Sequence, residues 1–296
     1  MNIRTLETFL KVADLENFTR AAAELDYVQS TVTNQIRQLE EELGFPLFDR
    51  IGKHVYLTPS GKEFRPYAED VLRTLQKVQT LGKSPEEMRG ALRFGTIESL
   101  LFSSLVSVLP DYQQIYRNVD FQLKIGHIED LMLWLRRNEL DMIYISGSIG
   151  PAPDLMSCYC RREEVIFVAS PSHPLARRKR VTFEEFLQWP RIDLERTGYC
   201  NNLLRRLAAD RGLVPARNMV VDNTKAIADM LKQGSGLSFL PEYSVADDIS
   251  RGLLVRLPVD VGPLYYYSQL LCHKSKWLPP FTEGLVSLIK KARPER

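Results

Sequence analysis

The stretch "YVQSTVTNQIRQLEEELG", residues 27 to 44, decides how the first part of the chain folds. Its apolar residues recur at steps of four, three and four, which is the spacing of one face of an α-helix. They are Val32, Ile36, Leu39 and Leu43. Gly44 follows at the place of a left-handed helix cap, and Pro46 comes soon after. The sequence therefore predicts a helix that ends near Gly44.

Uncharged hydrogen-bonding side chains fill the outer face of this helix, where Lys and Glu are usual. They are Gln29, Ser30, Thr31, Thr33, Asn34 and Gln35. Base edges in the major groove of DNA present donors and acceptors, and a Gln or Asn amide can make two hydrogen bonds to adenine. The Thr31 methyl could contact thymine. This face is predicted to read DNA; an ordinary helical protein-interaction domain is the alternative.

The flanking segments complete a winged helix-turn-helix. Residues 3–13 carry an amphipathic stripe, and Thr19 is expected to cap a short Ala-rich helix that ends near Leu25. A tight connection then leads to the polar-faced helix, which is the order of a helix-turn-helix. The segment "RIGKHVYL", residues 50–57, is typical of a hairpin that turns at Gly52 and Lys53.

The charge of this region restricts how it can bind DNA. Residues 1–65 hold eight basic and ten acidic residues, a net charge of −2. Phosphate contacts supply most non-specific affinity, so binding requires that Arg37, Arg50 and Lys53 share one surface. The acidic run at residues 40–42 must point elsewhere.

A fourth helix is predicted from Pro59, after a Thr58 cap, to about residue 81. Its apolar residues form a heptad seam of Phe64, Ala68, Val71, Leu75 and Val78, with Glu69, Arg73 and Lys77 beside it. Such a seam indicates a coiled coil between two subunits. The alternative is a helix packed on its own domain. Residues 82–85, "GKSP", are typical of a hinge.

From residue 91 short apolar strands alternate with helices, which predicts parallel strands joined by helical crossovers. The predicted strands are "ALRFGTI", "DFQLKIG" and "DMIYISG", and after Pro190 "RIDL", "NMVVD" and "GLSFLPE". Two similar α/β lobes are expected, with residues 155–170 and 263–273 crossing between them. A ligand would bind between the lobes, at the carboxyl ends of strands and the N-termini of helices.

Composition indicates a cytoplasmic globular protein. The chain has 296 residues, 44% of them hydrophobic, and a formal charge of +2 that favours neither nucleic acid nor membrane. Neither a membrane-spanning run nor a signal-peptide core is evident. The four cysteines are expected to be reduced packing residues, and His127 and His173 to be structural. No metal or cofactor is predicted. The cysteines are Cys158, Cys160, Cys200 and Cys272.

The string "NFTRAAAELDYVQSTVTNQIRQLEEELGFPLFDRIGKHVYLTPSG", residues 17–61, resembles the N-terminal domain of the LysR-type transcriptional regulators. Further likeness lies in "LRFGTI" at 92–97, "HPLA" at 173–176 and "GSGLSFLPE" at 234–242. The resemblance implies a winged helix-turn-helix, a dimerising linker helix, and a two-lobed α/β effector domain similar to periplasmic binding proteins.

The resemblance assigns approximate domain bounds and partners. Residues 1–58 would bind DNA, 59–88 would form the linker helix and hinge, and 89–296 the effector domain. Within that domain one lobe would hold about 89–161 plus 268–296, and the other about 162–267. The implied partners are operator DNA, a small-molecule effector, and further copies of the chain in a tetramer of two dimers. RNA polymerase is a further candidate partner.

Position by position, the resemblance makes Gln29, Ser30, Thr33 and Asn34 the base-reading candidates and Arg50 and Lys53 wing or backbone contacts. The chain departs from the family at three positions. The family commonly has Ser where this chain has Val28, Ser where it has Thr33, and Arg where it has Asn34. The first change removes a helix cap, and the last removes a phosphate or guanine contact. Operator sequence therefore cannot be borrowed from relatives.

The family's effector site lies between the lobes. Its positions here are Thr96, Glu98, Ser99, Ser146, Thr197, Tyr199, Cys200, Asn201, Asn223 and Thr224. Glu98 is unexpected beside an anion site, so it either caps its own helix or favours a ligand with an amine or hydroxyl. Cys200 matches the reactive Cys of a peroxide-responsive branch, but Ala209 replaces the partner Cys, so a neutral thiol is expected.

The sequence leaves two other functions open. One is a small-molecule-binding protein or enzyme whose helical N-terminus only mediates assembly. It has little support, since no nucleophile elbow, phosphate-binding Gly-rich loop or metal cluster stands in the sequence. The other is a pure repressor with a vestigial pocket. An effector-responsive transcriptional regulator that is not an enzyme is the leading interpretation.

Overall fold

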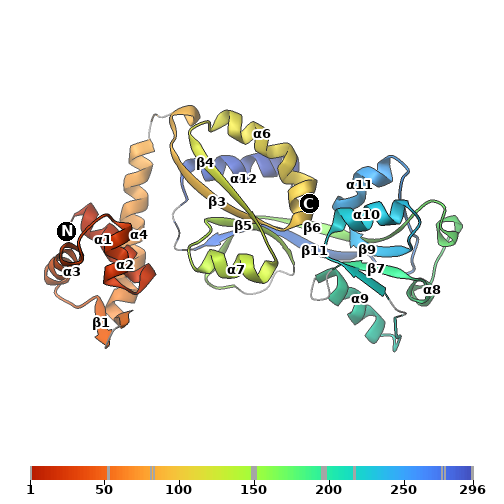
Figure 1. Ribbon diagram of the computed structural model, residues 1–296, viewed down its shortest axis with the longest axis horizontal. Helices are drawn as coiled ribbons and strands as arrows, with labels where there is room; N and C mark the ends of the chain where they lie inside the picture. Colours follow the sequence, from red (N-terminus) through yellow and green to blue (C-terminus); the bar gives the residue numbers. More distant parts are fainter. Residues whose placement is uncertain are drawn as a thin grey trace.

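A computed structural model of the chain describes residues 2–51, 54–80, 82, 84–147, 152–194, 199–215, 218–274, 276 and 278–294. A helical domain, a long connecting helix and two α/β lobes follow one another along the molecule (Figure 1). The α/β fold class, with a winged helix-turn-helix ahead of a two-lobed domain, is confirmed. No helix of the described residues is long and apolar enough to cross a membrane.

The N-terminal domain contains three helices and a hairpin around an aromatic core. The elements are α1 (Ile3–Leu15), α2 (Phe18–Glu24), α3 (Gln29–Leu43), β1 (Phe48–Ile51) and β2 (His54–Leu57). The ring of Phe9 lies 5.4 Å from that of Phe48 and 5.2 Å from that of Phe64. The strands pair antiparallel as predicted, and the turn residues Gly52 and Lys53 lie outside the described residues.

The caps of these helices differ from prediction in one place. Asn17 caps α2, because its side-chain oxygen accepts a hydrogen bond from the Arg20 N–H at 3.0 Å. Thr19, the predicted cap, lies inside the first turn and donates its hydroxyl to Gln29 Oε1 at 3.2 Å. At the end of α3 the prediction is confirmed, since Gly44 adopts φ 79° and its N–H donates to the Glu40 carbonyl.

The connecting helix α4 (Pro59–Thr80) begins at the predicted cap. Thr58 Oγ1 accepts from the Gly61 N–H at 2.9 Å and donates to the Pro46 carbonyl at 2.7 Å. Gly61 must be glycine, because a Cβ there would lie 2.2 Å from the carbonyl oxygen of Leu47. The close approach of α4 to the hairpin therefore depends on this residue.

The heptad seam of α4 is divided in two. Phe64 and Ala68 pack into the core of the N-terminal domain, whereas Val71 and Val78 are 44% and 57% exposed. Glu69, predicted as a charge beside the seam, is buried and accepts from Arg65 Nε at 2.9 Å. The first half therefore holds the domain together, and the second half presents an apolar surface.

The first lobe has three parallel strands covered on both faces by helices. The strands are β3 (Gly90–Thr96), β4 (Val119–Ile125) and β5 (Met142–Gly147); η1 (Pro85–Glu87) precedes them. The helices are α5 (Glu98–Leu100), the π-helical η2 (Leu101–Leu105), α6 (Val106–Ile115), α7 (Ile128–Arg136) and α12 (Pro280–Ala292). Helices α6 and α12 cover one face and α7 the other (Figure 1).

The second lobe repeats this plan. Its parallel strands are β7 (Arg191–Leu194), β8 (Asn218–Val221) and β9 (Leu237–Pro241). Its helices are η3 (Pro174–Arg177), α8 (Phe183–Gln188), α9 (Tyr199–Ala209), α10 (Thr224–Lys232) and α11 (Glu242–Ser250). Side chains from α8 and α9 form one core cluster, and those from α10 and α11 a second.

Two long strands join the lobes, as predicted. β6 (Leu155–Ala169) and β11 (Leu264–His273) pair antiparallel along their lengths. β11 also pairs with β5 of the first lobe, and β6 with β9 of the second and with β10 (Val255–Arg256). The order β4-β3-β5-β11-β6-β9-β7-β8 is therefore one hydrogen-bonded path through both lobes.

Candidate nucleic-acid interface and ligand cleft

Helix α3 separates its two faces as the sequence predicts. Gln29, Ser30 and Asn34 are exposed and Thr31 and Thr33 are half-buried, whereas Val32, Ile36 and Leu39 are buried. Val28 is the N-cap, is 67% exposed, and makes no side-chain cap bond within the described residues. Gln35 is a correction: its Oε1 accepts from the Thr8 hydroxyl at 2.6 Å, so it joins α3 to α1.

The cations of this region are described only in part. The exposed Arg37 side chain lies 3.6 Å from Glu41, and both are about 70% exposed. Exposed pairs of this kind contribute little stability, so Arg37 is free to exchange Glu41 for a phosphate. The backbone of Arg50 lies in β1, but its side chain and all of Lys53 lie outside the described residues. A shared basic surface therefore stays a prediction.

The acidic run of α3 does not point away as a whole, since Glu41 lies beside the predicted phosphate contact Arg37. Glu40 Oε1 accepts from the backbone N–H of Leu47 at 2.7 Å and of Phe48 at 3.2 Å. Glu42 accepts from the Gln38 amide at 3.3 Å. Glu40 thus positions the chain that enters the hairpin, a role that the sequence reasoning missed.

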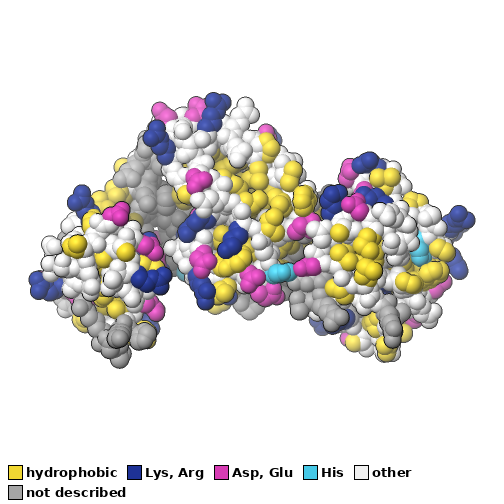
Figure 2. Space-filling model, in the orientation of Figure 1, with side chains coloured by type: hydrophobic (Ala, Val, Ile, Leu, Met, Phe, Trp, Pro, Cys, Tyr) yellow, Lys and Arg dark blue, Asp and Glu magenta, His cyan; other side chains and the backbone are white. Residues whose placement is uncertain are grey.

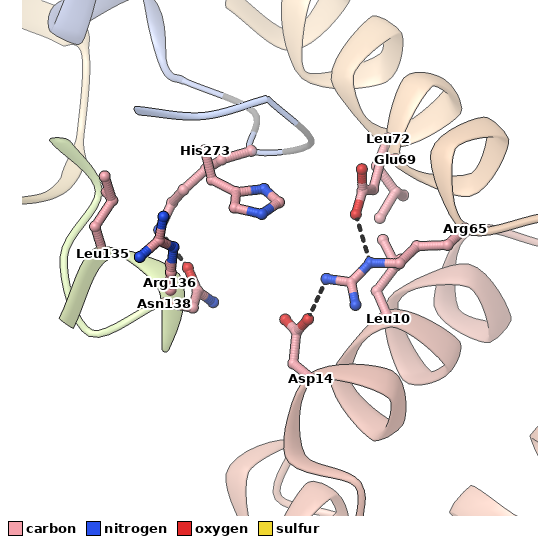
Figure 3. A pocket seen from close by; sticks show the side chains of 10 residues that line it. Leu10, Asp14, Arg65, Glu69, Leu72, Leu135, Arg136, Asn138 and His273 are labelled. Atoms are coloured by element: carbon pink, nitrogen blue, oxygen red, sulfur yellow. Dashed lines mark hydrogen bonds and ion pairs between the residues drawn. The ribbon is translucent and has the colours of Figure 1, made fainter. Parts of the chain in front are cut away.

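Helices α1 and α4 face the first lobe across a cavity of about 250 Å³ (Figure 3). The Arg65 guanidinium lies between two carboxylates, 2.5 Å from Asp14 of α1 and 2.9 Å from Glu69 of α4. Arg136 and His273 of the lobe lie on the opposite side (Figure 3). Arg65 therefore ties α1 to α4 and fixes the connecting helix against the DNA-binding domain.

A second cavity, of about 450 Å³, lies between the two lobes. Seven predicted effector residues line it: Glu98, Ser99, Ser146, Tyr199, Cys200, Asn223 and Thr224. The structure therefore brings together residues from both lobes that are far apart in the sequence. The cavity lies at helix N-termini and strand ends, where α/β proteins bind ligands.

Three predicted effector residues do not line this cavity within the described part of the chain. Thr96 is fully buried and donates its hydroxyl to the Tyr144 carbonyl at 2.9 Å, so it joins neighbouring strands. Asn201 is buried within α9. Thr197 lies outside the described residues. These residues were predicted from their polar side chains and their positions in the sequence. Their burial in the folded chain, however, decides whether a ligand can reach them.

Glu98 corrects the expectation that it caps its own helix, because it caps a helix of the other lobe. Its Oε2 accepts from the N–H of Thr224 at 3.2 Å and from the Thr224 hydroxyl at 2.8 Å. Thr224 begins α10, where Asn223 is the N-cap. The carboxylate therefore bridges the cleft and occupies the positive end of α10.

His127 was expected to be structural, but it lies at the mouth of the cleft. It precedes α7 at the N-cap position, and its Nε2 lies 3.6 Å from Asp222 Oδ2 of the second lobe. Both side chains are about half exposed. His173 does have a structural role, since its Nδ1 accepts from the Leu175 N–H at 3.2 Å. The sequence carried no signal of the His127 pairing, because Asp222 is distant along the chain.

Of the aromatic side chains described in the cleft lining, the sequence reasoning named Tyr199 and missed Trp134, Tyr243 and Tyr266. Tyr199 and Tyr266 stack with ring centroids 5.6 Å apart, and Tyr243 lies beside Tyr266. The Tyr243 hydroxyl lies 3.1 Å from Ser99 Oγ. Burial raises the pKa of Tyr243 and of Tyr266, so both hydroxyls stay protonated.

The cysteines behave as the expected packing residues. Cys200 lines the cleft, and burial raises the pKa of its thiol to about 12, so the thiol is neutral. Cys158 packs at the core of the first lobe, with its Sγ 3.4 Å from that of Cys272. Cys158, Cys160, Cys200 and Cys272 form no disulfide.

The chain joins a winged helix-turn-helix to a two-lobed domain with a ligand-sized cleft. This arrangement defines a class of regulator that has a DNA-binding part and a ligand-binding part in one chain. Residues 3–62 match the family model described as bacterial regulatory helix-turn-helix protein, lysR family. Residues 85–294 match that of the LysR substrate binding domain. The chain belongs to the LysR family, and it is a DNA-binding transcriptional regulator with an effector-binding domain rather than an enzyme.

Similar proteins span nearly the whole chain. The uncharacterised HTH-type transcriptional regulator YwqM of Bacillus subtilis is 30% identical over 298 residues, which cover 98% of this chain and 99% of YwqM. The HTH-type transcriptional regulator GltR of the same organism is 32% identical over 85% of this chain and 83% of GltR.

Solved structures share the fold. Full-length OxyR from Pseudomonas aeruginosa, as a cysteine-to-aspartate variant, matches with a TM-score of 0.63 at 21% identity, covering 99% of this chain and 96% of that one. Full-length CbnR complexed with its target DNA matches with a TM-score of 0.54 at 19% identity, covering 99% of both chains.

Proposed function

We propose that the protein binds an operator through α3 and that a small molecule held between the two lobes changes this binding. The observation that best supports the proposal is α3 itself, whose exposed face is polar and uncharged over its first turns. Gln29, Ser30, Thr33 and Asn34 read base edges, and Thr31 contacts a thymine methyl. Arg37, Arg50 and Lys53 contact phosphates.

The exposed half of the α4 seam supports assembly. Val71 and Val78 are exposed on α4, so we propose that they pair with α4 of a second copy. Two such dimers form a tetramer on an extended operator, and each dimer presents two copies of α3 to successive major grooves. RNA polymerase is a further proposed partner, and the cytoplasm the proposed location.

Residues 59–88 serve in this proposal as the dimerising segment between the DNA-binding domain, 1–58, and the effector domain, 89–296. The effector contacts the cleft residues Glu98, Ser99, Tyr199 and Thr224 from both lobes. Because these residues belong to two bodies, a ligand that touches all of them favours one arrangement of the lobes.

Binding to the DNA upstream of the protein's own gene tests the proposal. Gln29→Ala and Asn34→Ala are expected to reduce the preference for this DNA over scrambled DNA, each by about 1–3 kcal/mol. Arg50→Ala is expected to weaken binding to both DNAs alike and to lower the salt dependence. Fluorescence anisotropy across a salt series measures both effects.

Gln38→Ala is the matched control, since Gln38 is an exposed amide on α3 beyond the reading turns. It should leave the preference unchanged. A reversed pattern, in which Arg50→Ala changes preference and Asn34→Ala does not, would show that another face reads DNA. Absence of salt-dependent binding by the unaltered chain would reject the proposed function.

A further inference from the structure

We propose that the effector carries a positive charge, as an ammonium group on an apolar or aromatic body. The inference rests on the proposed function, since it concerns the ligand of the same cleft. It follows from three features of the cleft: the sign of its charges, the state of its helix N-termini, and a hydrogen-bonding atom that it leaves unsatisfied.

The charges that line the cleft are acidic. Glu98, Asp130 and Asp222 contribute carboxylates, and none of the lining residues that the structure describes is Lys or Arg. His127 is the one described lining side chain that can become cationic, and it lies beside Asp222. Figure 2 shows acidic side chains gathered where the two lobes meet. A field of this sign attracts cations and repels anions.

The N-termini of α10 and α7, which face the cleft, already carry polar or acidic side chains of the chain itself. Glu98 accepts the Thr224 N–H at the start of α10, and Asn223 Oδ1 accepts the Ala226 N–H at 2.7 Å. The first turn of α7 carries Glu129 and Asp130. A ligand carboxylate would normally bind at such N-termini. Here it would have to displace Glu98 or bind beside it.

The cleft also retains an unsatisfied polar atom. Glu98 Oε1 is inaccessible to solvent and has no hydrogen-bond partner within the described residues. An ammonium group has three donors and no acceptor. A modest rotation of Glu98 would let an ammonium in the cleft donate to Oε1 while Oε2 stays on Thr224.

The aromatic walls suit the rest of such a ligand. The stacked rings of Tyr199 and Tyr266 offer apolar surface and ring faces, and Trp134 also belongs to the lining. Lys124 already places its Nζ 3.3 Å from the centroid of the Trp134 ring. Cations are attracted to such faces, so the wall itself tolerates positive charge.

Isothermal titration calorimetry on the full chain tests the inference with charge-inverted pairs of similar shape. The pairs are tyramine with 4-hydroxyphenylacetate, and cadaverine with pimelate. We expect at least one amine to bind and to raise the unfolding temperature, and neither acid to do so. Glu98→Gln removes the charge but keeps an acceptor for Thr224, and it is expected to weaken amine binding about tenfold or more.

Glu139→Gln is the control, since Glu139 is an exposed acid of the same lobe that does not line the cleft. It should bind the amine as the unaltered chain does. The inference is overturned if the acids bind and the amines do not, if no amine of the panel binds, or if Glu98→Gln leaves amine binding unchanged. Salt-dependent binding to promoter DNA, measured on the same samples, distinguishes this failure from that of the proposed function.

Discussion

Glu40 lies in the helix that is proposed to read DNA, yet its carboxylate serves the backbone. Its Oε1 accepts two N–H donors at the entrance to the hairpin, from Leu47 and Phe48. Charge-assisted bonds to two backbone donors are stronger than a typical surface contact. The acid at this position is therefore explained by the fold, independently of DNA.

Replacing Glu40 by Ala should destabilise the chain, because two backbone donors would lose their acceptor. The expected loss is about 1–3 kcal/mol, measured as the change in the free energy of unfolding in urea. Glu42→Ala, a change at an exposed acid of the same run, should cost less than about 0.5 kcal/mol. Equal effects of the two substitutions would contradict the role assigned to Glu40.

Cys200 should resist alkylation in the folded chain. Burial raises the pKa of its thiol to about 12, so the reactive thiolate is suppressed at pH 8. Hydrogen bonding from Cys272 lowers the pKa of the half-buried Cys158 thiol. Iodoacetamide should therefore label Cys200 about tenfold or more slowly than Cys158, as measured by peptide mass spectrometry. In unfolding urea the two rates should converge; faster labelling of native Cys200 would contradict its burial.

The sequence predicted the positions of residues whose neighbours lie in the same helix. It did not predict contacts between residues that are far apart along the chain. The exposure of Gln29 and Asn34 follows from their position between apolar residues of one helix. The role of Glu98 could not be predicted, since its partner Thr224 lies 126 residues away. The same holds for His127, whose partner belongs to the other lobe.

At the scale of elements, α4 combines two tasks along one apolar stripe. Its first turns complete the N-terminal core through Phe64 and Ala68, and its later turns expose Val71 and Val78. The heptad pattern in the sequence cannot separate these tasks, because both need the same spacing. Packing on the helix's own domain is confirmed for the first half, and the coiled coil stays a prediction for the second half.

Charges placed on the exposed half of the seam should break the dimer without unfolding the N-terminal domain. The double variant Val71→Glu with Val78→Glu is expected to sediment as a monomer at micromolar concentration, because like charges would face each other across the interface. Lys62→Glu adds acid to an exposed site of α4 outside the seam and should leave assembly unchanged. An assembled double variant would exclude this seam as the interface.

Most elements could be predicted from periodicity, and the errors have physical reasons. The steps of four and three in α3 and the crossing strands β6 and β11 were correctly predicted. Thr19 was wrongly chosen as a cap because Asn17 and Thr19 are both good cap residues two positions apart. The Gln35 contact to Thr8 could not be predicted, since helix packing decides which polar side chains turn inward.

At the scale of the whole molecule, a buried ion pair ties the end of the chain to the strands between the lobes. Arg293, after α12, donates from Nη2 to both oxygens of Glu163 at 2.9 Å. Glu163 lies in β6 and also accepts from Ser268 of β11 at 2.6 Å. Both members of the ion pair are less than 10% exposed. The C-terminal segment thus supports the crossing.

Replacing one member of this ion pair should lower the free energy of unfolding more than replacing both members. Arg293→Met leaves the Glu163 carboxylate buried beside fewer donors and should cost about 3–5 kcal/mol in the free energy of unfolding. Adding Glu163→Gln removes the uncompensated charge, so the double variant should regain a substantial part of that loss. Urea unfolding measures both. A double variant no more stable than Arg293→Met would show that charge burial is not the cause.

The unbroken ladder from β5 through β11 and β6 to β9 limits how the lobes can move. Sliding or separation would break backbone hydrogen bonds along the crossing, so the low-cost deformation is a twist of β6 and β11 about their length. The register shift between Leu270 and Leu271 interrupts the regular pairing of these two strands. A ligand that draws the lobes together would therefore rotate one lobe against the other about this strand pair. The segment that carries α4 would then be turned and not shifted.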